Sequence, residues 1–149
     1  MKSLFNPETL LEITERINHL RPDSKALWGV MNPAQMLKHC QGPLEIATGR
    51  KNPPRMFIGR LLAPFMKAIY YNDKPWGKGI QTAPEFKTLG NYDFNEEKAK
   101  LLEMVNEFSK GGEAKCSKNP NPFFGKLTPE QTALGQYKHL DHHLQQFGI

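Results

Sequence analysis

Residues 128–147 read TPEQTALGQYKHLDHHLQQF and contain both the start signal and the apolar pattern of an α-helix. Thr128 is a favoured N-cap residue, Pro129 suits the first helical position, and Gln131 completes a capping box. The apolar side chains then recur at helical spacing and form one stripe, made by Ala133, Tyr137, Leu140, Leu144 and Phe147. The stretch therefore predicts a helix that reaches Phe147 and packs this stripe against a core.

The same start signal, an N-cap residue followed by proline, occurs twice earlier, at Asn6-Pro7 and Asn32-Pro33. The first pair predicts a helix over residues 7–18. The second predicts a helix that Gly42-Pro43 should kink or interrupt, because proline cannot donate the amide hydrogen of a helical bond.

Two further helices are expected over residues 56–71 and 93–109, the latter ending before a glycine pair. The segments 72–92 and 113–127 are rich in residues that break regular structure, and we expect a long ordered loop in each place. No repeat and no convincing strand alternation occurs. We therefore expect one all-α domain over residues 1–149, a four-helix bundle with one extra short or broken helix.

Composition excludes several classes of protein. The 149 residues are 38% hydrophobic and 23% charged, with no run of about 18 apolar residues that could span a membrane. The start of the chain lacks the apolar region of a signal peptide, and Cys40 and Cys116 cannot form a framework of several disulfides. We expect a cytoplasmic protein without a membrane segment, in which Cys40 is a small core residue.

The formal charge of +5 is concentrated in one segment. Residues 50–87 contain eight basic and two acidic residues, whereas the rest of the chain is close to neutral. Aromatic residues are interleaved there, so a nucleic acid or an anionic small molecule is a candidate partner. Because the segment carries no nucleic-acid-binding motif, we expect no nucleic-acid partner and interpret it as a solvated helix face with a basic loop.

Three of the five histidines lie in the last predicted helix. At 100° per residue, His139 and His143 fall about 100° and about 60° to one side of Leu140, on one flank of the apolar stripe. His142 lies nearly opposite the stripe. It is expected either at the surface or in contact with a metal ligand, without binding the metal itself. Residues four apart in a helix lie close enough for both rings to bind one ion, so the spacing predicts a metal-binding pair at His139 and His143.

Two histidines rarely hold a divalent ion alone, so a third ligand should come from another helix. His39 occupies the equivalent flank of its own helix, beside the inward-pointing Met36 and Cys40. His19 lies at a helix end and has no such setting. The residues alone leave two interpretations open: a three-histidine metal site, or ordinary polar and core histidines.

Neighbours of the predicted site have other expected roles. Gln136 shares the flank of His143 and can hydrogen-bond a bound water. Asp141 points away, which suits a solvated acid or an ion-pair partner. Tyr137 belongs to the core stripe, with its hydroxyl at the rim, and the inward direction of Cys40 makes it a poor nucleophile.

Four segments resemble one family. They read WGVMNPAQMLKHC at 28–40, TAPEF at 82–86, FFGKLTPE at 123–130 and YKHLDHHLQQFG at 137–148. These segments are similar to the DinB/YfiT-like superfamily and, more narrowly, to its uncharacterised branch, domain-of-unknown-function family 1569. The resemblance implies a DinB-like four-helix bundle whose metal ligands are His39, His139 and His143.

The resemblance also implies a function. Three imidazoles leave coordination positions open, which is typical of a catalytic rather than a structural site. Characterised relatives in the superfamily transfer low-molecular-weight thiols or isomerise substrates with a thiol cofactor. We therefore expect a metal-dependent thiol transferase, or a related transferase or hydrolase, that uses zinc or nickel, a low-molecular-weight thiol and a small-molecule substrate. The basic segment 50–87 can hold the carboxylates of the thiol cosubstrate.

Alternatives remain at this stage. The chain can instead be a non-catalytic bundle that binds a small molecule or a partner. A bundle of this kind can also pair through a helix face, which makes a homodimer one expected state. Where the branch often has a histidine, this chain has Asn121, so the resemblance supplies no extra ligand or proton donor at that position.

Overall fold

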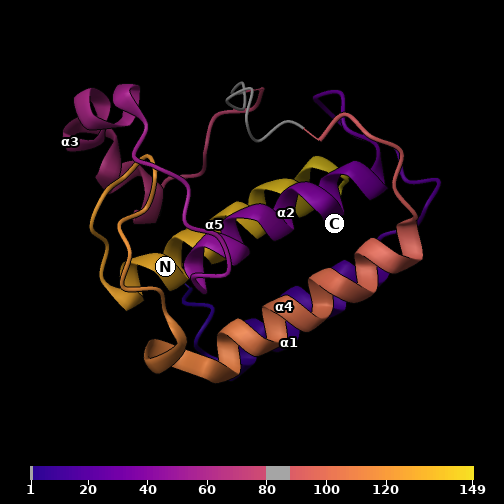
Figure 1. The fold of residues 1–149 in the computed structure, drawn as a ribbon. Coiled ribbons are helices and arrows are strands. Elements are labelled where there is room, and N and C mark those ends of the chain that lie inside the picture. The colour runs from indigo at the N-terminus through magenta and orange to yellow at the C-terminus, as the bar shows by residue number, and fades with distance from the viewer. Residues whose placement is uncertain (1, 80–87) are drawn as a thin grey trace.

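Five helices form the fold in a computed structural model that describes residues 2–79 and 88–149. They are α1 (Pro7–His19), α2 (Pro33–Ala47), α3 (Phe57–Tyr71), α4 (Phe94–Lys115) and α5 (Pro129–Gln146). The helices α1, α2, α4 and α5 run alongside one another as a bundle, with α3 outside it against α5 (Figure 1). The predicted all-α class is confirmed. The described residues contain no strand and no helix that is long and apolar enough to cross a membrane.

The predicted helix starts are confirmed by their hydrogen bonds. Asn32 and Thr128 each form a capping box, in which the N-cap side chain accepts a bond from the third helical amide. Asn6 and Asp93 cap α1 and α4 in a similar way, although neither helix closes the full box. Because these signals are local, the sequence contains them in readable form.

Gly42-Pro43 was predicted to kink or interrupt α2; the interruption is wrong, and the kink stays a prediction. The helix continues through Pro43 to Ala47. Cys40 and Leu44, on either side of the proline, are both buried in the core, and this packing holds the helical path that the missing amide bond would weaken.

The helix predicted over residues 93–109, ending before the glycine pair, agrees with the break that the structure shows at that pair. Two helical segments that meet at Gly112 make up α4, and the second of them ends at Lys115. Gly112 does leave helical geometry, with φ 55° and ψ −154°, a conformation that favours glycine. The glycine pair therefore ends the first helical segment as predicted, and the short helical turn that follows it was not predicted.

The core lies between the four bundle helices. Its largest side chains with almost no exposure include Phe108, Ile13, Met36, Leu37, Leu44, Leu101, Leu140 and Leu144. The stripe expected on α5 takes part in this core, with Tyr137 half-buried at its edge. The core therefore fixes the rotation of α5, and with it the direction of the histidines on its flank.

Helix α3 approaches α5 closely because Gly135 leaves room for Tyr70. A Cβ atom at position 135 would lie 2.0 Å from the Tyr70 ring. The ammonium group of Lys138 on α5 donates hydrogen bonds to the carbonyl oxygens of Ile69 and Asn72, at 2.5 and 3.0 Å, and so satisfies the end of α3.

The long loops are described in part. The segment 72–92 is non-helical where the structure describes it, while the TAPEF stretch and Lys87 lie outside the described residues. In the second loop Asn121 organises a turn: its side-chain oxygen accepts bonds from the amides of Phe123 and Phe124, and its backbone pairs with Gly125. Asn121 therefore has a structural role in this chain.

Candidate metal centre

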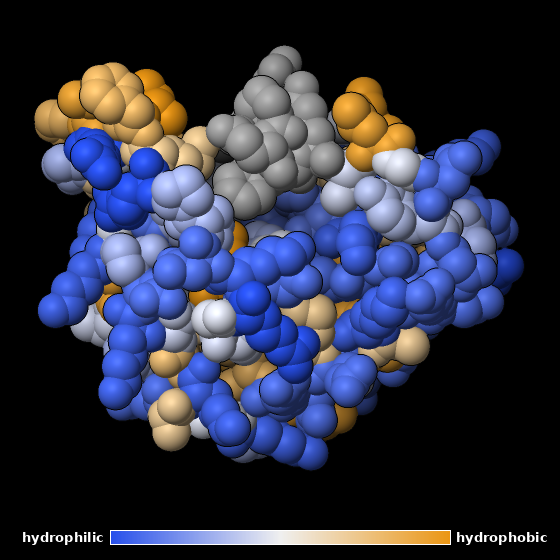
Figure 2. Space-filling model, viewed as in Figure 1, coloured by the Kyte–Doolittle hydropathy of each residue, from blue (hydrophilic) through white to orange (hydrophobic). Residues whose placement is uncertain are grey.

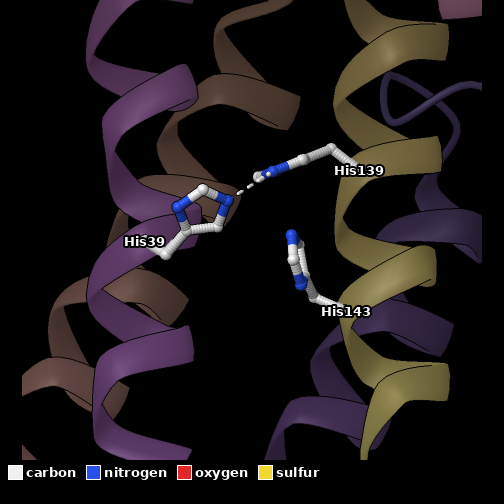
Figure 3. Close-up of side chains that lie close together, drawn as sticks. All are labelled: His39, His139 and His143. Atoms are coloured by element: carbon white, nitrogen blue, oxygen red, sulfur yellow. Dashed lines mark hydrogen bonds between the residues drawn. The ribbon is translucent and has the colours of Figure 1, made fainter. Parts of the chain in front are cut away.

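Three histidine rings meet between α2 and α5. His39 comes from α2, and His139 and His143 come from successive turns of α5. A nitrogen of each ring is directed toward the space between them (Figure 3). All three residues are buried, with exposed fractions of 7 to 8%. The structure thus brings together the three residues that the sequence predicted as one site.

The spacing of the rings suits a single ion. One nitrogen from each ring lies within 4.8 Å of the other two, and the Nε2 atoms of His39 and His139 are 3.1 Å apart. Two ligands about 2.1 Å from a tetrahedral ion are about 3.4 Å from each other. Small side-chain rotations therefore bring the set to ligand distances, so these three buried histidines can hold a metal ion.

Two of the rings, those of His139 and His143, are uncharged at neutral pH. The pKa of His143 is lowered to about 3, chiefly by burial and secondly by the nearby His39. Burial also lowers the pKa of His139 well below its usual value, with contributions from His143 and His39. Neutral imidazole is the form that binds a metal, so His139 and His143 need lose no proton to bind one at neutral pH.

Gln146 fixes the tautomer of His143. The amide nitrogen of Gln146 donates a bond to the carbonyl oxygen of Trp28 at 2.6 Å, so its Oε1 atom is free to accept. That oxygen lies 2.9 Å from Nδ1 of His143, which must then carry the hydrogen. The lone pair of His143 is consequently on Nε2, and a hydrogen bond of this kind is what orients metal-binding histidines in proteins.

Gly29 is required beside Gln146. It has a φ of 78°, in the left-handed region, and a Cβ there would lie 2.4 Å from the amide nitrogen of Gln146. Sequence reasoning missed Gln146. The available signal was its position three residues after His143, on the same flank of the helix by the 100° rule.

Replacing Gln146 by leucine is expected to weaken metal binding by about 10- to 100-fold, because His143 loses the partner that orients it. Competition with a chromophoric chelator measures the affinity. Gln145→Leu is the matched control, since Gln145 is exposed and bonds Asp141 instead. Equal affinities for the two variants would show that the Gln146 contact does not support a metal ligand.

His142 and His19 do not join the cluster. The half-buried ring of His142 contacts two tryptophans, with centroid distances of 5.9 Å to Trp28 and 5.8 Å to Trp76. Trp76 also contacts His139, at 5.8 Å. His19 is exposed at the end of α1. His142 is therefore an aromatic neighbour of the site, consistent with its predicted place outside the ligand set.

Three other neighbours of the site have the roles expected from the sequence. Asp141 forms an ion pair with Arg16 at 2.7 Å, and Tyr137 is half-buried with its hydroxyl toward Glu12. Cys40 is buried, and burial raises the pKa of its thiol, which keeps it protonated and unreactive.

Gln136 is engaged by the protein. Its amide nitrogen donates to the carbonyl oxygen of Pro43 at 3.2 Å and to the hydroxyl of Tyr70 at 3.3 Å. Its buried Oε1 atom has no hydrogen-bond partner among the protein atoms. The expected bond from Gln136 to a water therefore stays a prediction.

A cavity of about 660 Å³ opens beside His39. Among the side chains that line it are three basic residues, Lys38, Lys51 and Arg55, and one acidic residue, Glu45. Lys51 is paired with Glu45 at 2.5 Å. Lys38 lies 3.5 Å from the carboxylate of the buried Glu97. The sequence predicted basic residues near the site, but Lys38 lies outside the basic segment and was not anticipated.

Arg55 is the cavity cation that has no carboxylate within ion-pair distance among the described residues. Its guanidinium group makes one long bond, from Nη2 to the carbonyl oxygen of Phe123 at 3.5 Å. Its Nε atom is buried without an acceptor. Arg55 therefore retains the capacity to bind an anionic group.

Comparison with known proteins identifies the family and no closer relative. No curated protein and no solved structure matches the chain. The model of a family described as Protein of unknown function (DUF1569) matches residues 2–148, and the chain therefore belongs to that family.

Proposed function

We propose that this protein is a metal-dependent enzyme that acts on a small molecule, with His39, His139 and His143 as the metal ligands. The observation that carries the proposal is the convergence of three buried imidazoles from two helices, one of them oriented by Gln146. Imidazole nitrogen suits zinc and nickel, which are the metals we favour. The resemblance to the DinB/YfiT-like superfamily supports the same assignment.

A catalytic role follows from the number of ligands. Three protein ligands leave at least one position for a water or a substrate, whereas structural zinc sites are usually closed by four. A divalent ion held by neutral imidazoles keeps its full charge and lowers the pKa of a water or a thiol that binds it. Burial of the rings excludes bulk water around the ligands.

The cavity supports an anionic thiol as cosubstrate. It borders His39 and has more basic than acidic side chains. We propose that Arg55 binds a carboxylate of the thiol while the sulfur is directed toward the histidines. Both cysteines of the chain are unpaired, which supports a reducing, cytoplasmic location.

Metal analysis of protein purified without an affinity tag tests the proposal. We expect about one zinc or nickel ion per chain and turnover on a panel of thiols with electrophilic acceptors. Protein that takes up no zinc or nickel at micromolar concentration contradicts the proposal. Metal retained without any turnover indicates a binding protein instead of an enzyme.

The cobalt form tests Arg55, because a thiolate that binds cobalt gives a charge-transfer absorption band. We expect 3-mercaptopropionate to bind at least about 10-fold more tightly than 2-mercaptoethanol, since a charged hydrogen bond contributes about 1.5 to 3 kcal/mol. Arg55→Gln should remove most of this preference. Arg60→Gln is the control, because Arg60 on α3 is solvent-exposed. A preference that is unchanged in Arg55→Gln would place the carboxylate elsewhere.

A further inference from the structure

Helix α3 exposes an apolar face that the rest of the described chain does not cover. Seven large hydrophobic residues on this one helix are 37 to 80% exposed: Phe57, Ile58, Leu61, Leu62, Phe65, Met66 and Ile69. They form the orange group over α3 at the upper left of Figure 2. Scattered single hydrophobics on a surface are ordinary, but a contiguous patch of this kind marks an interaction site.

The exposed face is distinct from the side that packs on α5. At 100° per residue, the seven residues cover an arc of about 180°, from Phe57 to Met66. About the next 60° of the helix surface, counted onward from Met66, holds the buried residues Gly59, Ala63 and Tyr70, which face the interior of the monomer. The helix therefore has one apolar side used inside the monomer and a second, wider one turned outward.

The charges of α3 lie away from this face. Arg60 and Lys67 fall about 280° to 300° from Phe57, on the flank opposite the exposed arc. The ammonium group of Lys67 donates a bond to the carbonyl oxygen of Lys126, which draws it back toward the protein. An anionic membrane surface attracts a helix through basic side chains beside its apolar arc, and α3 directs its own two elsewhere.

The area of the face is that of a protein interface. From the exposed fractions, the seven side chains present about 700 Å² of apolar surface, close to the roughly 800 Å² that each partner buries in a standard complex. Because the arc carries no charge, a second copy related by a two-fold axis meets no like-charge repulsion within it. We propose that α3 pairs with α3 of a second copy and forms a symmetric homodimer through this face.

This inference is independent of the metal site. The dimer contact uses the outward side of α3, whereas α5 holds two of the histidines and touches the inward side. Failure of either proposal therefore leaves the other standing.

Sedimentation velocity of the full chain over a range of concentrations tests the dimer. We expect the wild-type protein to be dimeric at micromolar concentration, and Leu61→Glu with Phe65→Glu to weaken association at least about 100-fold. Leu11→Glu is the matched control, because Leu11 is a 60% exposed hydrophobic residue on α1. Unchanged far- and near-ultraviolet circular dichroism spectra establish that the double variant is folded.

A second measurement uses the wild-type protein alone, so it tests the dimer even if the double variant does not fold. In the wild-type protein, amide hydrogen exchange in α3 should slow as concentration rises, while exchange in α1 should not change. A dissociation constant of about 100 μM is, by order of magnitude, the upper end for a weak specific dimer. Wild-type protein that is monomeric at about 100 μM therefore overturns the proposal. A dimer that persists in the double variant also overturns the proposal. So does a monomer that binds phosphatidylcholine–phosphatidylglycerol vesicles through α3 in a flotation assay.

Discussion

Replacing His143 by alanine is expected to reduce zinc and cobalt affinity by more than about 100-fold. The change removes one of only three protein ligands and leaves Gln146 without the ring that it orients. His39→Ala and His139→Ala should have effects of similar size, because each removes one nitrogen from the same cluster. Isothermal titration of the metal into chelator-treated protein measures the loss.

The other two histidines are matched controls for this experiment. His142→Ala removes a ring next to the cluster that is not part of it, and His19→Ala removes an exposed ring at the end of α1. We expect changes of less than about 10-fold for His142 and none for His19. An unchanged affinity in His39→Ala would mean that no ion is held between α2 and α5.

The metal-free protein is expected to lose stability in mild acid. The pKa of His143 is about 3 in the folded chain, against its ordinary value of 6.5, so the unfolded chain binds more protons between these values. The contribution is complete above pH 6.5 and is lost progressively as pH falls toward 3. At pH 4.5, about two units below 6.5, His143 alone lowers the free energy of unfolding by about 3 kcal/mol. His139 acts in the same direction.

Urea unfolding at several pH values, with a chelator present, measures this effect. The variant His143→Gln carries no group that titrates at this position, so its loss between pH 7.5 and pH 4.5 should be smaller by about 3 kcal/mol. His19→Gln should retain the full wild-type pH dependence. Superimposable profiles for His143→Gln and the wild type would show that His143 is not held uncharged by its surroundings.

Much of the site was predictable because it depends on helical periodicity. The angular position of His139 and His143 follows from their spacing from Leu140, which the core fixes. The position of His39 beside Cys40 placed it on the matching flank of a second helix. The N-cap and proline signals gave the helix starts for a related reason, since they depend only on neighbouring residues.

What sequence reasoning missed depends on tertiary contacts. The role of Gln146 requires the carbonyl oxygen of Trp28, 118 residues away. The cavity joins Lys38 on α2 to Arg55 in the following segment, and no local pattern connects them. The path of α2 through Pro43 is likewise decided by packing, which outweighs a local preference.

The two tryptophans have a practical consequence. They are the only ones in the chain, and both contact the ring of His142 beside the candidate centre. Intrinsic fluorescence of this protein therefore reports on one place rather than on an average over the fold. A paramagnetic ion bound there would quench both emitters, and a ligand in contact with either indole would shift the emission. The protein thus contains its own optical reporter, which needs no label and leaves the histidines untouched.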